Sequence, residues 1–322
     1  MNIRTTDYYK DFECLAGECP KTCCANWNIP IDRATRAHYR SLEGVIGKHA
    51  RSVLKGGTFK NKDGRCPFLQ ENGLCSMIIA AGNQGDLSFV CRTYPRKIST
   101  FGNEQHISLS VSCPMAARQL LQCGKMTFVT SKTDEPPQMN SIDPALYKTL
   151  IAMRDDCICI VQDDSDILSK RVEKMLHKLN IPVSSVTMER RFAKLVRIFL
   201  RMRYNNRDLK RYFCLLKNSN RLQTALQQAD HVAKKHHVLM ENLLVYMLDR
   251  YVLEAVDDGD YASRIKLCLH WCMMFFLILC DAYAQNGAPD EAKIEELLVD
   301  YSRHTEHNDR NLRILMRAKH II

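Results

Sequence analysis

The chain of 322 residues contains little glycine in the positions where many nucleotide-binding enzymes need it. It has 13 glycines, only two of them, Gly259 and Gly287, lie after residue 144, and nowhere are two glycines separated by a single residue. The doubly wound fold that binds nucleotide cofactors uses a strand, a glycine-rich turn and a helix in succession. The absence of any G-x-G turn argues against that fold.

Long apolar runs are also missing. The most apolar segment, 267–280, is 14 residues long and contains His270, whereas a helix that crosses a membrane needs about 20 apolar residues. The N-terminal stretch MNIRTTDYYKDFEC lacks the apolar run of a signal peptide. We therefore expect a buried helix at 267–280, no membrane partner and a cytoplasmic location.

Positive charge is in excess, mainly in the first part of the chain. The net charge is +10, and residues 1–130 carry 17 Lys and Arg against 10 Asp and Glu, whereas the remainder carries 29 against 26. Such an excess favours acidic partners, including protein surfaces and small anions. No aromatic-basic RNA motif and no zinc-finger spacing accompanies it, so nucleic acid is not an expected partner.

Cysteine, in contrast, is abundant and clustered. Eight of the 15 cysteines lie within one hundred residues, four of them in the segment CLAGECPKTCC. A cytoplasmic protein rarely uses such a cluster as a disulfide framework, and metal or redox chemistry is the usual purpose. We predict that this group holds a metal, and its members are Cys14, Cys19, Cys23, Cys24, Cys66, Cys75, Cys91 and Cys113.

The type of metal centre stays open at this point. Four thiolates can close either a tetrahedral zinc site or an iron-sulfur cluster. Proline follows Cys19, Cys66 and Cys113, and a Cys-Pro pair ends one familiar iron-sulfur ligand run, which favours iron-sulfur over zinc. Adjacent Cys23 and Cys24 diverge, so one of them is expected to bind while its neighbour packs or serves a second site. Free cysteines are also commonly buried as apolar side chains, the role expected for the other seven.

The predicted fold is a cysteine-rich α+β metal-binding domain at 1–130, a linker at 131–144 and a mainly α-helical domain at 145–322. The linker prediction depends on three prolines and the absence of an apolar period. Glycine is scarce beyond it and apolar residues recur at helical spacing. Helices are expected at about 143–154, 165–180, 187–216, 219–228, 231–256, 261–286, 289–303 and 307–319.

Shorter elements are expected in the first part. Asp32 should cap a helix that reaches Leu42, with Gly44 as its stop and a second helix at 45–54. The pair Asn72-Gly73 predicts a hairpin that would place Cys66 and Cys75 on neighbouring strands. Further elements are a short helix capped by Asp86 that carries Cys91, a hairpin of strands 97–101 and 105–112, and a helix from Pro114 to about Gln122.

Several of these motifs resemble those of the flagellin lysine-N-methylase family. They are the stretch 9–39, YKDFECLAGECPKTCCANWNIPIDRATRAHY, then CPFL at 66–69, GLC at 73–75 and LSFVCRTYPR at 87–96. The first part is also similar to small cysteine-cluster proteins that chelate zinc or iron. The resemblance covers about the first 115 residues.

This resemblance implies transfer of a methyl group from S-adenosylmethionine to lysine side chains of flagellin, with a cysteine-ligated metal centre. It implies Cys19, Cys23, Cys24, Cys66, Cys75 and Cys91 as ligand candidates, with Cys14 also on the pattern. Because a lysine must lose its proton before methylation, an aromatic, partly apolar slot is expected, with Tyr8, Tyr9, Trp27 and Tyr94 as candidates. Two alternatives stay open: a non-enzymatic metal-cluster module that recruits or matures a partner protein, and a redox or metal-handling protein.

Overall fold

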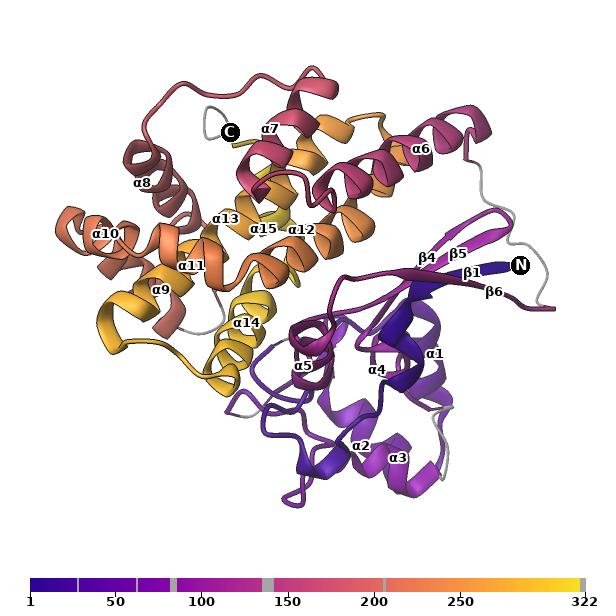
Figure 1. Cartoon of the computed structure of the whole chain (residues 1–322). Helices are drawn as coiled ribbons and strands as arrows, with labels where there is room; N and C mark the ends of the chain where they lie inside the picture. Colours follow the sequence, from indigo (N-terminus) through magenta and orange to yellow (C-terminus); the bar gives the residue numbers. More distant parts are fainter. Residues whose placement is uncertain (28, 62, 82–85, 135–141, 205–206, 319–322) are drawn as a thin grey trace.

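The computed structural model of the chain describes all residues except 28, 62, 82–85, 135–141, 205–206 and 319–322. Strands and short helices make up the N-terminal part, and longer helices follow from residue 144 onward. Figure 1 shows the indigo-to-magenta N-terminal part packed against the orange and yellow helices. The mixed N-terminal part and helical C-terminal part confirm this much of the predicted fold class.

A four-stranded sheet with the order β4-β5-β1-β6 joins the two ends of the N-terminal part. Strand β1 (Asn2–Thr6) pairs in parallel with β5 (Glu104–Leu109) and antiparallel with β6 (Phe128–Lys132). Strand β4 (Arg96–Phe101) forms the predicted hairpin with β5. The strands β1 and β6 were not predicted, because their short polar sequences become strands only through pairing with distant residues.

A smaller unit surrounds the cysteines. It contains α1 (Arg33–Ser41), α2 (Gly44–Val53), the two-residue strands β2 (Leu54–Lys55) and β3 (Thr58–Phe59), α3 (Ser76–Ala81) and α4 (Phe89–Thr93). Its core consists of Ile31, Tyr39, Ala50, Phe59, Phe68, Met77 and Leu87, with Cys66, Cys75 and Cys91 packed against it. The short elements η1 (Asp7–Asp11) and η2 (Ala16–Glu18) precede this unit, and α5 (Pro114–Gln122) follows it.

The helical part is organised around α13 (Tyr261–Asn286). This helix is apolar on most faces, and 16 of its 26 residues are buried, among them the whole predicted segment 267–280 except Met273 and Phe276. Its length and hydropathy would allow it to cross a membrane, but 78% of its most apolar window is buried inside the protein. A helix that is apolar all round is expected in such a core.

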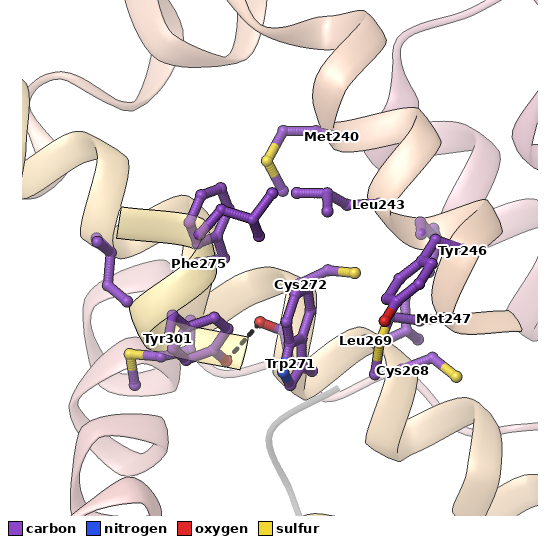
Figure 2. Close-up of a cluster of buried hydrophobic side chains, with 14 of the residues drawn as sticks. Met240, Leu243, Tyr246, Met247, Cys268, Leu269, Trp271, Cys272, Phe275 and Tyr301 are labelled. Atoms are coloured by element: carbon purple, nitrogen blue, oxygen red, sulfur yellow. Dashed lines mark hydrogen bonds between the residues drawn. The ribbon is translucent and has the colours of Figure 1, made fainter. Parts of the chain in front are cut away.

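The centre of this core joins aromatic and sulfur-containing side chains from three helices. Trp271 and Phe275 of α13 stack on Tyr301 of α14, whose hydroxyl donates to the Trp271 carbonyl at 2.9 Å (Figure 2). Cys268 and Cys272 lie in the same core and are fully or almost fully buried. This confirms the packing role predicted for the later cysteines at these two positions, whereas the same prediction is wrong for Cys159 and Cys214, which are exposed.

The remaining helices cover α13. Their bounds are α6 (Pro144–Val161), α7 (Leu168–Lys178), α8 (Met188–Phe199), α9 (Arg207–Leu216), α10 (Ser219–Leu226), α11 (Ala229–Lys235), α12 (His237–Tyr251), η3 (Val252–Asp257), α14 (Glu291–Thr305) and α15 (Asp309–Met316). The large core that they share with α13 also includes Leu109, Val111 and Leu120 of the N-terminal part. The division at 131–144 stays a prediction, although β6 extends into it as far as Lys132.

One long helix predicted at 187–216 is wrong, because the chain leaves the helix after α8. The Arg203 backbone N–H donates to the Asn311 side-chain oxygen at 2.9 Å, and the Asn311 amide donates to the Arg203 carbonyl at 2.8 Å. Asn311 is fully buried. A distant side chain thus satisfies the backbone groups that a continuous helix would have paired internally.

Three local predictions in the cysteine-rich part also need correction. Gly44 begins α2 instead of only stopping the preceding helix. Ser88 caps α4 in place of Asp86, since its hydroxyl accepts from the Cys91 N–H at 3.3 Å. Cys66 and Cys75 do not stand on neighbouring strands; only an isolated bridge between Leu69 and Cys75 forms around the Asn72-Gly73 turn. The Asp32 cap of α1 is confirmed.

Candidate functional site

Four cysteines from separate segments of the first part gather near the small core. The group consists of Cys24, Cys66, Cys75 and Cys91. Each of these four thiols interacts electrostatically with the other three. The Cys66 N–H donates to the Cys24 carbonyl at 2.8 Å, which fixes the two segments together. We call these residues, Cys24, Cys66, Cys75 and Cys91, the cysteine tetrad.

Burial governs the protonation of the tetrad. It raises the pKa of Cys66 to about 12 and that of Cys91 to about 11, and nearby thiolates add to both increases. The Cys23 thiol donates to the Cys24 sulfur, which lowers the pKa of Cys24 to about 7 and raises that of Cys23. A bound cation would favour the thiolate forms at all of these positions.

Four sulfur donors are the donor set of a four-thiolate zinc site or of an iron-sulfur cluster. The chemistry of the tetrad therefore fits such a group. Among the residues that the structure describes, however, no three His, Cys, Asp or Glu side chains lie close enough to hold a metal ion. The ligand roles predicted for these cysteines stay predictions.

The other predicted ligands lie toward the large core. Cys113 is buried in that core just before α5, and it interacts electrostatically with Cys19 and Cys14. The exposed Cys14 accepts from the Ala16 N–H at 3.4 Å, and the Cys19 thiol donates to the Lys21 carbonyl at 3.3 Å. The eight predicted cysteines are all free thiols.

An aromatic group connects residues 14–27, which we call the cysteine loop, to the helical part. The Trp27 ring meets the Tyr94 ring edge-on at 5.2 Å and the His307 ring at 4.8 Å, measured between ring centroids. The Trp27 indole donates to the Cys23 carbonyl at 2.6 Å. We call Trp27, Tyr94 and His307 the aromatic junction.

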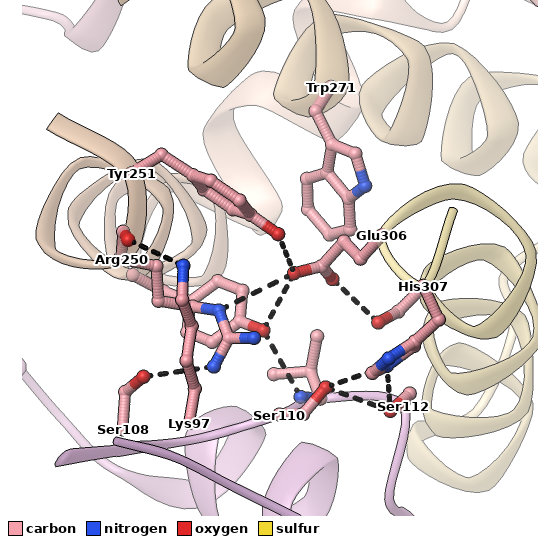
Figure 3. Close-up of polar contacts among 12 residues, drawn as sticks. Lys97, Ser108, Ser110, Ser112, Arg250, Tyr251, Trp271, Glu306 and His307 are labelled. Carbon is pink, nitrogen blue, oxygen red and sulfur yellow. Dashed lines mark hydrogen bonds and ion pairs between the residues drawn. The ribbon is translucent and has the colours of Figure 1, made fainter. Parts of the chain in front are cut away.

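Hydrogen bonds through two serines hold His307 in this position. Its Nε2 atom lies 2.8 Å from the Ser112 hydroxyl and 3.2 Å from the Ser110 hydroxyl (Figure 3). The Ser112 hydroxyl also lies 3.0 Å from that of Tyr94. His307 as a residue is nevertheless exposed, and Trp27 and Tyr94 are half-buried.

Arg303 of α14 fastens the junction to the cysteine loop. Its guanidinium donates to the Ser112 carbonyl at 2.9 Å and to the Thr22 carbonyl at 3.3 Å, and it lies 5.1 Å from the Trp27 ring centroid. Desolvation of the ring and the positive charges of Arg250 and Arg303 lower the pKa of His307. The imidazole is therefore neutral near pH 7.

A buried polar network around Glu306 holds the segment that carries His307. Glu306, next to His307 in sequence, accepts from the hydroxyls of Tyr246 at 3.0 Å, Tyr251 at 3.1 Å and Ser302 at 2.6 Å. Its side chain is fully buried, and it forms an ion pair of 3.6 Å with Arg250 (Figure 3). These contacts fix the chain segment that carries His307.

The sequence indicated only part of this site. Trp27 and Tyr94 were slot candidates and do lie together, whereas Tyr8 is buried in the large core and Tyr9 accepts from Arg96 at 2.9 Å. His307, Arg303, Ser110 and Ser112 were missed. No spacing rule links them to Trp27, since only the packing of α14 against the cysteine loop brings them there.

Comparison with known proteins places the chain in a family. The family model for the FliB lysine N-methylase C-terminal domain matches residues 147–319. This range includes Arg303, Glu306 and His307, whereas the motifs that suggested the resemblance lie in the first part. No solved structure matches the chain.

Individual relatives agree with the family model. The chain is 27% identical to "Lysine-N-methylase" of Salmonella choleraesuis over 47% of its own length and 40% of that protein, and 27% identical to the protein of the same name in Salmonella typhimurium over 43% and 38%. It is 32% identical to "Flagellar biosynthetic protein FliU" of Salmonella muenchen over 38% of its length and 78% of that protein. The matched segments thus span about two fifths of the two lysine-N-methylases. The chain belongs to the FliB-type flagellin lysine N-methylase family.

Proposed function

We propose that this protein methylates lysine side chains of flagellin in the cytoplasm, with S-adenosylmethionine as the methyl donor. Family membership and the printed names of the relatives support lysine methylation in a flagellar setting. The structural observation that carries the proposal is the aromatic junction, which both parts of the chain build and which includes the exposed residue His307.

The junction suits a lysine side chain. Trp27 and Tyr94 offer aromatic faces to its methylene groups and to its cationic end. Arg303, close to the Trp27 ring, disfavours a second positive charge and so promotes loss of the ammonium proton. The neutral His307 imidazole, oriented by Ser112, is a hydrogen-bond partner for the amine, and the proton itself leaves to solvent because Arg250 and Arg303 also disfavour a positive charge on His307.

When bound, S-adenosylmethionine supplies a methyl carbon attached to a positively charged sulfur. The neutral lysine nitrogen forms a bond to this carbon as the carbon–sulfur bond breaks, and the electron pair of that bond stays on sulfur. Trp27, Tyr94 and His307 would hold the amine. The donor would not bind as in a doubly wound fold, because the sheet is mixed and the chain lacks a G-x-G turn. We place it between the cysteine-rich and helical parts.

We further propose that the cysteine tetrad holds a metal centre, an iron-sulfur cluster in preference to zinc. The four mutually interacting thiols support this assignment. The Trp27–Cys23 hydrogen bond connects the tetrad's loop to the junction, so a metal centre would hold Trp27 in place. Cys14, Cys19 and Cys113 form a neighbouring group that would support the loop.

Replacing Cys66 by serine is expected to remove most of the bound metal, because a four-thiolate site loses one ligand and the small core loses a packed sulfur. Elemental analysis of protein purified without oxygen measures the metal, and iron with equimolar sulfide separates a cluster from zinc. Cys214→Ser is the matched control, since Cys214 is exposed on α9. Equal metal content in the two variants would refute the tetrad assignment.

The methylation proposal is tested by incubating the purified protein with flagellin and S-adenosylmethionine that carries a labelled methyl group. Mass spectrometry of flagellin peptides should find the label on lysine side chains. Unlabelled flagellin, with the metal content intact, would favour the alternative of a non-enzymatic module that recruits or matures a partner protein.

A further inference from the structure

A hollow lined by three arginines lies on the N-terminal part, and none of its lining residues belongs to the aromatic junction. It has a volume of about 360 Å³ and is lined by Arg36, Arg40, Arg51, Leu54, Gly56 and Gly57. The arginines come from α1 and α2, and the glycines form the turn between β2 and β3. We call it the arginine hollow.

Arg51 is held in place by the end of α1. Its Nη1 atom donates to the Leu42 carbonyl at 2.6 Å and to the Arg40 carbonyl at 3.3 Å. These are carbonyls that a helix leaves unpaired at its C-terminus, where a cation is favoured. Arg51 therefore has a structural role and also presents a fixed positive charge to the hollow.

Arg36 and Arg40 have no structural role comparable to that of Arg51. They lie one turn apart on α1, a spacing at which like charges repel. Within the described ranges of the chain, neither forms an ion pair with a carboxylate. Two unpaired guanidinium groups beside a third constitute a strong local excess of positive charge.

The glycine turn leaves room for Arg36. A Cβ atom at Gly57 would lie 3.2 Å from the Arg36 Nη1 atom, and Gly57 has a φ of +95° that other residues rarely adopt. The backbone can thus approach the guanidinium closely. A hydrogen bond of 2.8 Å from the Ile31 N–H to the Gly57 carbonyl holds the glycine turn in place.

We propose that the arginine hollow binds a compact, multiply charged oxyanion, the diphosphate group of a small phosphorylated molecule. Guanidinium groups pair with phosphate oxygens through two parallel hydrogen bonds. Three of them around one hollow match the charge of a diphosphate, whereas a single carboxylate of an acidic peptide would neutralise only one. The hollow is also within the size range of small-molecule sites. This site is independent of the methylation proposed above.

Isothermal titration calorimetry of the full-length protein with inorganic pyrophosphate tests the site. The variants Arg36→Gln and Arg40→Gln should each raise the Kd for pyrophosphate by about tenfold or more, because each removes a charge-assisted pair. Arg33→Gln is the matched control, an exposed arginine on the same helix outside the hollow. It should leave the Kd within about twofold, since exposed charges at a distance are screened by salt.

Two results would overturn the proposal. One is a loss of affinity in Arg33→Gln equal to that in the other two variants, which would indicate a diffuse basic surface. The other is tighter binding of an aspartate-rich peptide than of pyrophosphate at the same ionic strength, which would indicate an acidic protein partner. Circular dichroism checks the fold of each variant. Arg36 lies against Gly57, so Arg36→Gln could disturb the glycine turn. Arg40 is exposed and does not lie against Gly57, so Arg40→Gln tests the site even in that case.

Discussion

Replacing His307 by alanine is expected to lower kcat for flagellin methylation by about tenfold, the scale of one lost hydrogen bond to the reacting amine. The variant removes the imidazole from the Ser110 and Ser112 hydroxyls and from the Trp27 ring. Most of the effect should appear in kcat and little in KM, because Trp27 and Tyr94 still offer aromatic faces to the lysine. Single-turnover methylation of flagellin, followed by mass spectrometry, separates the two quantities.

The control for this experiment is His177→Ala. His177 is an exposed histidine on α7, and its loss should leave activity unchanged. Metal content and circular dichroism of His307→Ala are measured beside the kinetics, so that loss of the imidazole is distinguished from loss of the metal or of the fold. Full activity in His307→Ala would show that the aromatic junction is not the methylation site.

Glu306→Gln is expected to lower the free energy of unfolding by about 3–5 kcal/mol, the cost of leaving a buried charge without its partner. Glu306 accepts hydrogen bonds from Tyr246, Tyr251 and Ser302 and pairs with Arg250, whose side chain is 4% exposed. Glutamine keeps the shape but leaves the Arg250 guanidinium uncompensated in the core. Urea-induced unfolding measures the change.

A second ion pair supplies the matched control. Glu295 pairs with Arg118 at 2.9 Å, but the Arg118 side chain is 43% exposed. Glu295→Gln should therefore cost no more than about 1 kcal/mol. Adding Arg250→Met to Glu306→Gln should recover part of the lost stability, because the unpaired charge is removed. Equal costs for Glu306→Gln and Glu295→Gln would contradict the role assigned to the buried network.

Helix-forming segments could be read from the sequence where apolar periodicity was long. The helix α13 was predicted with its observed bounds, and the helix that begins at Pro114 was predicted to its last residue. The prediction failed at Arg203, where a buried Asn311 side chain takes over the backbone hydrogen bonds. It also failed at β1 and β6, because strand pairing between residues more than one hundred positions apart leaves no local signal.

The sequence alone determined that eight cysteines occur together, that the second half is helical and that the chain resembles a methylase family, because spacing and periodicity are properties of the chain itself. Only the tertiary structure decided which four thiols interact, which aromatic residues meet His307, and where three arginines converge. Those juxtapositions arise when α14 packs on the cysteine loop and α1 on the β2–β3 turn. Both contacts depend on burial between distant segments, which a linear pattern does not encode.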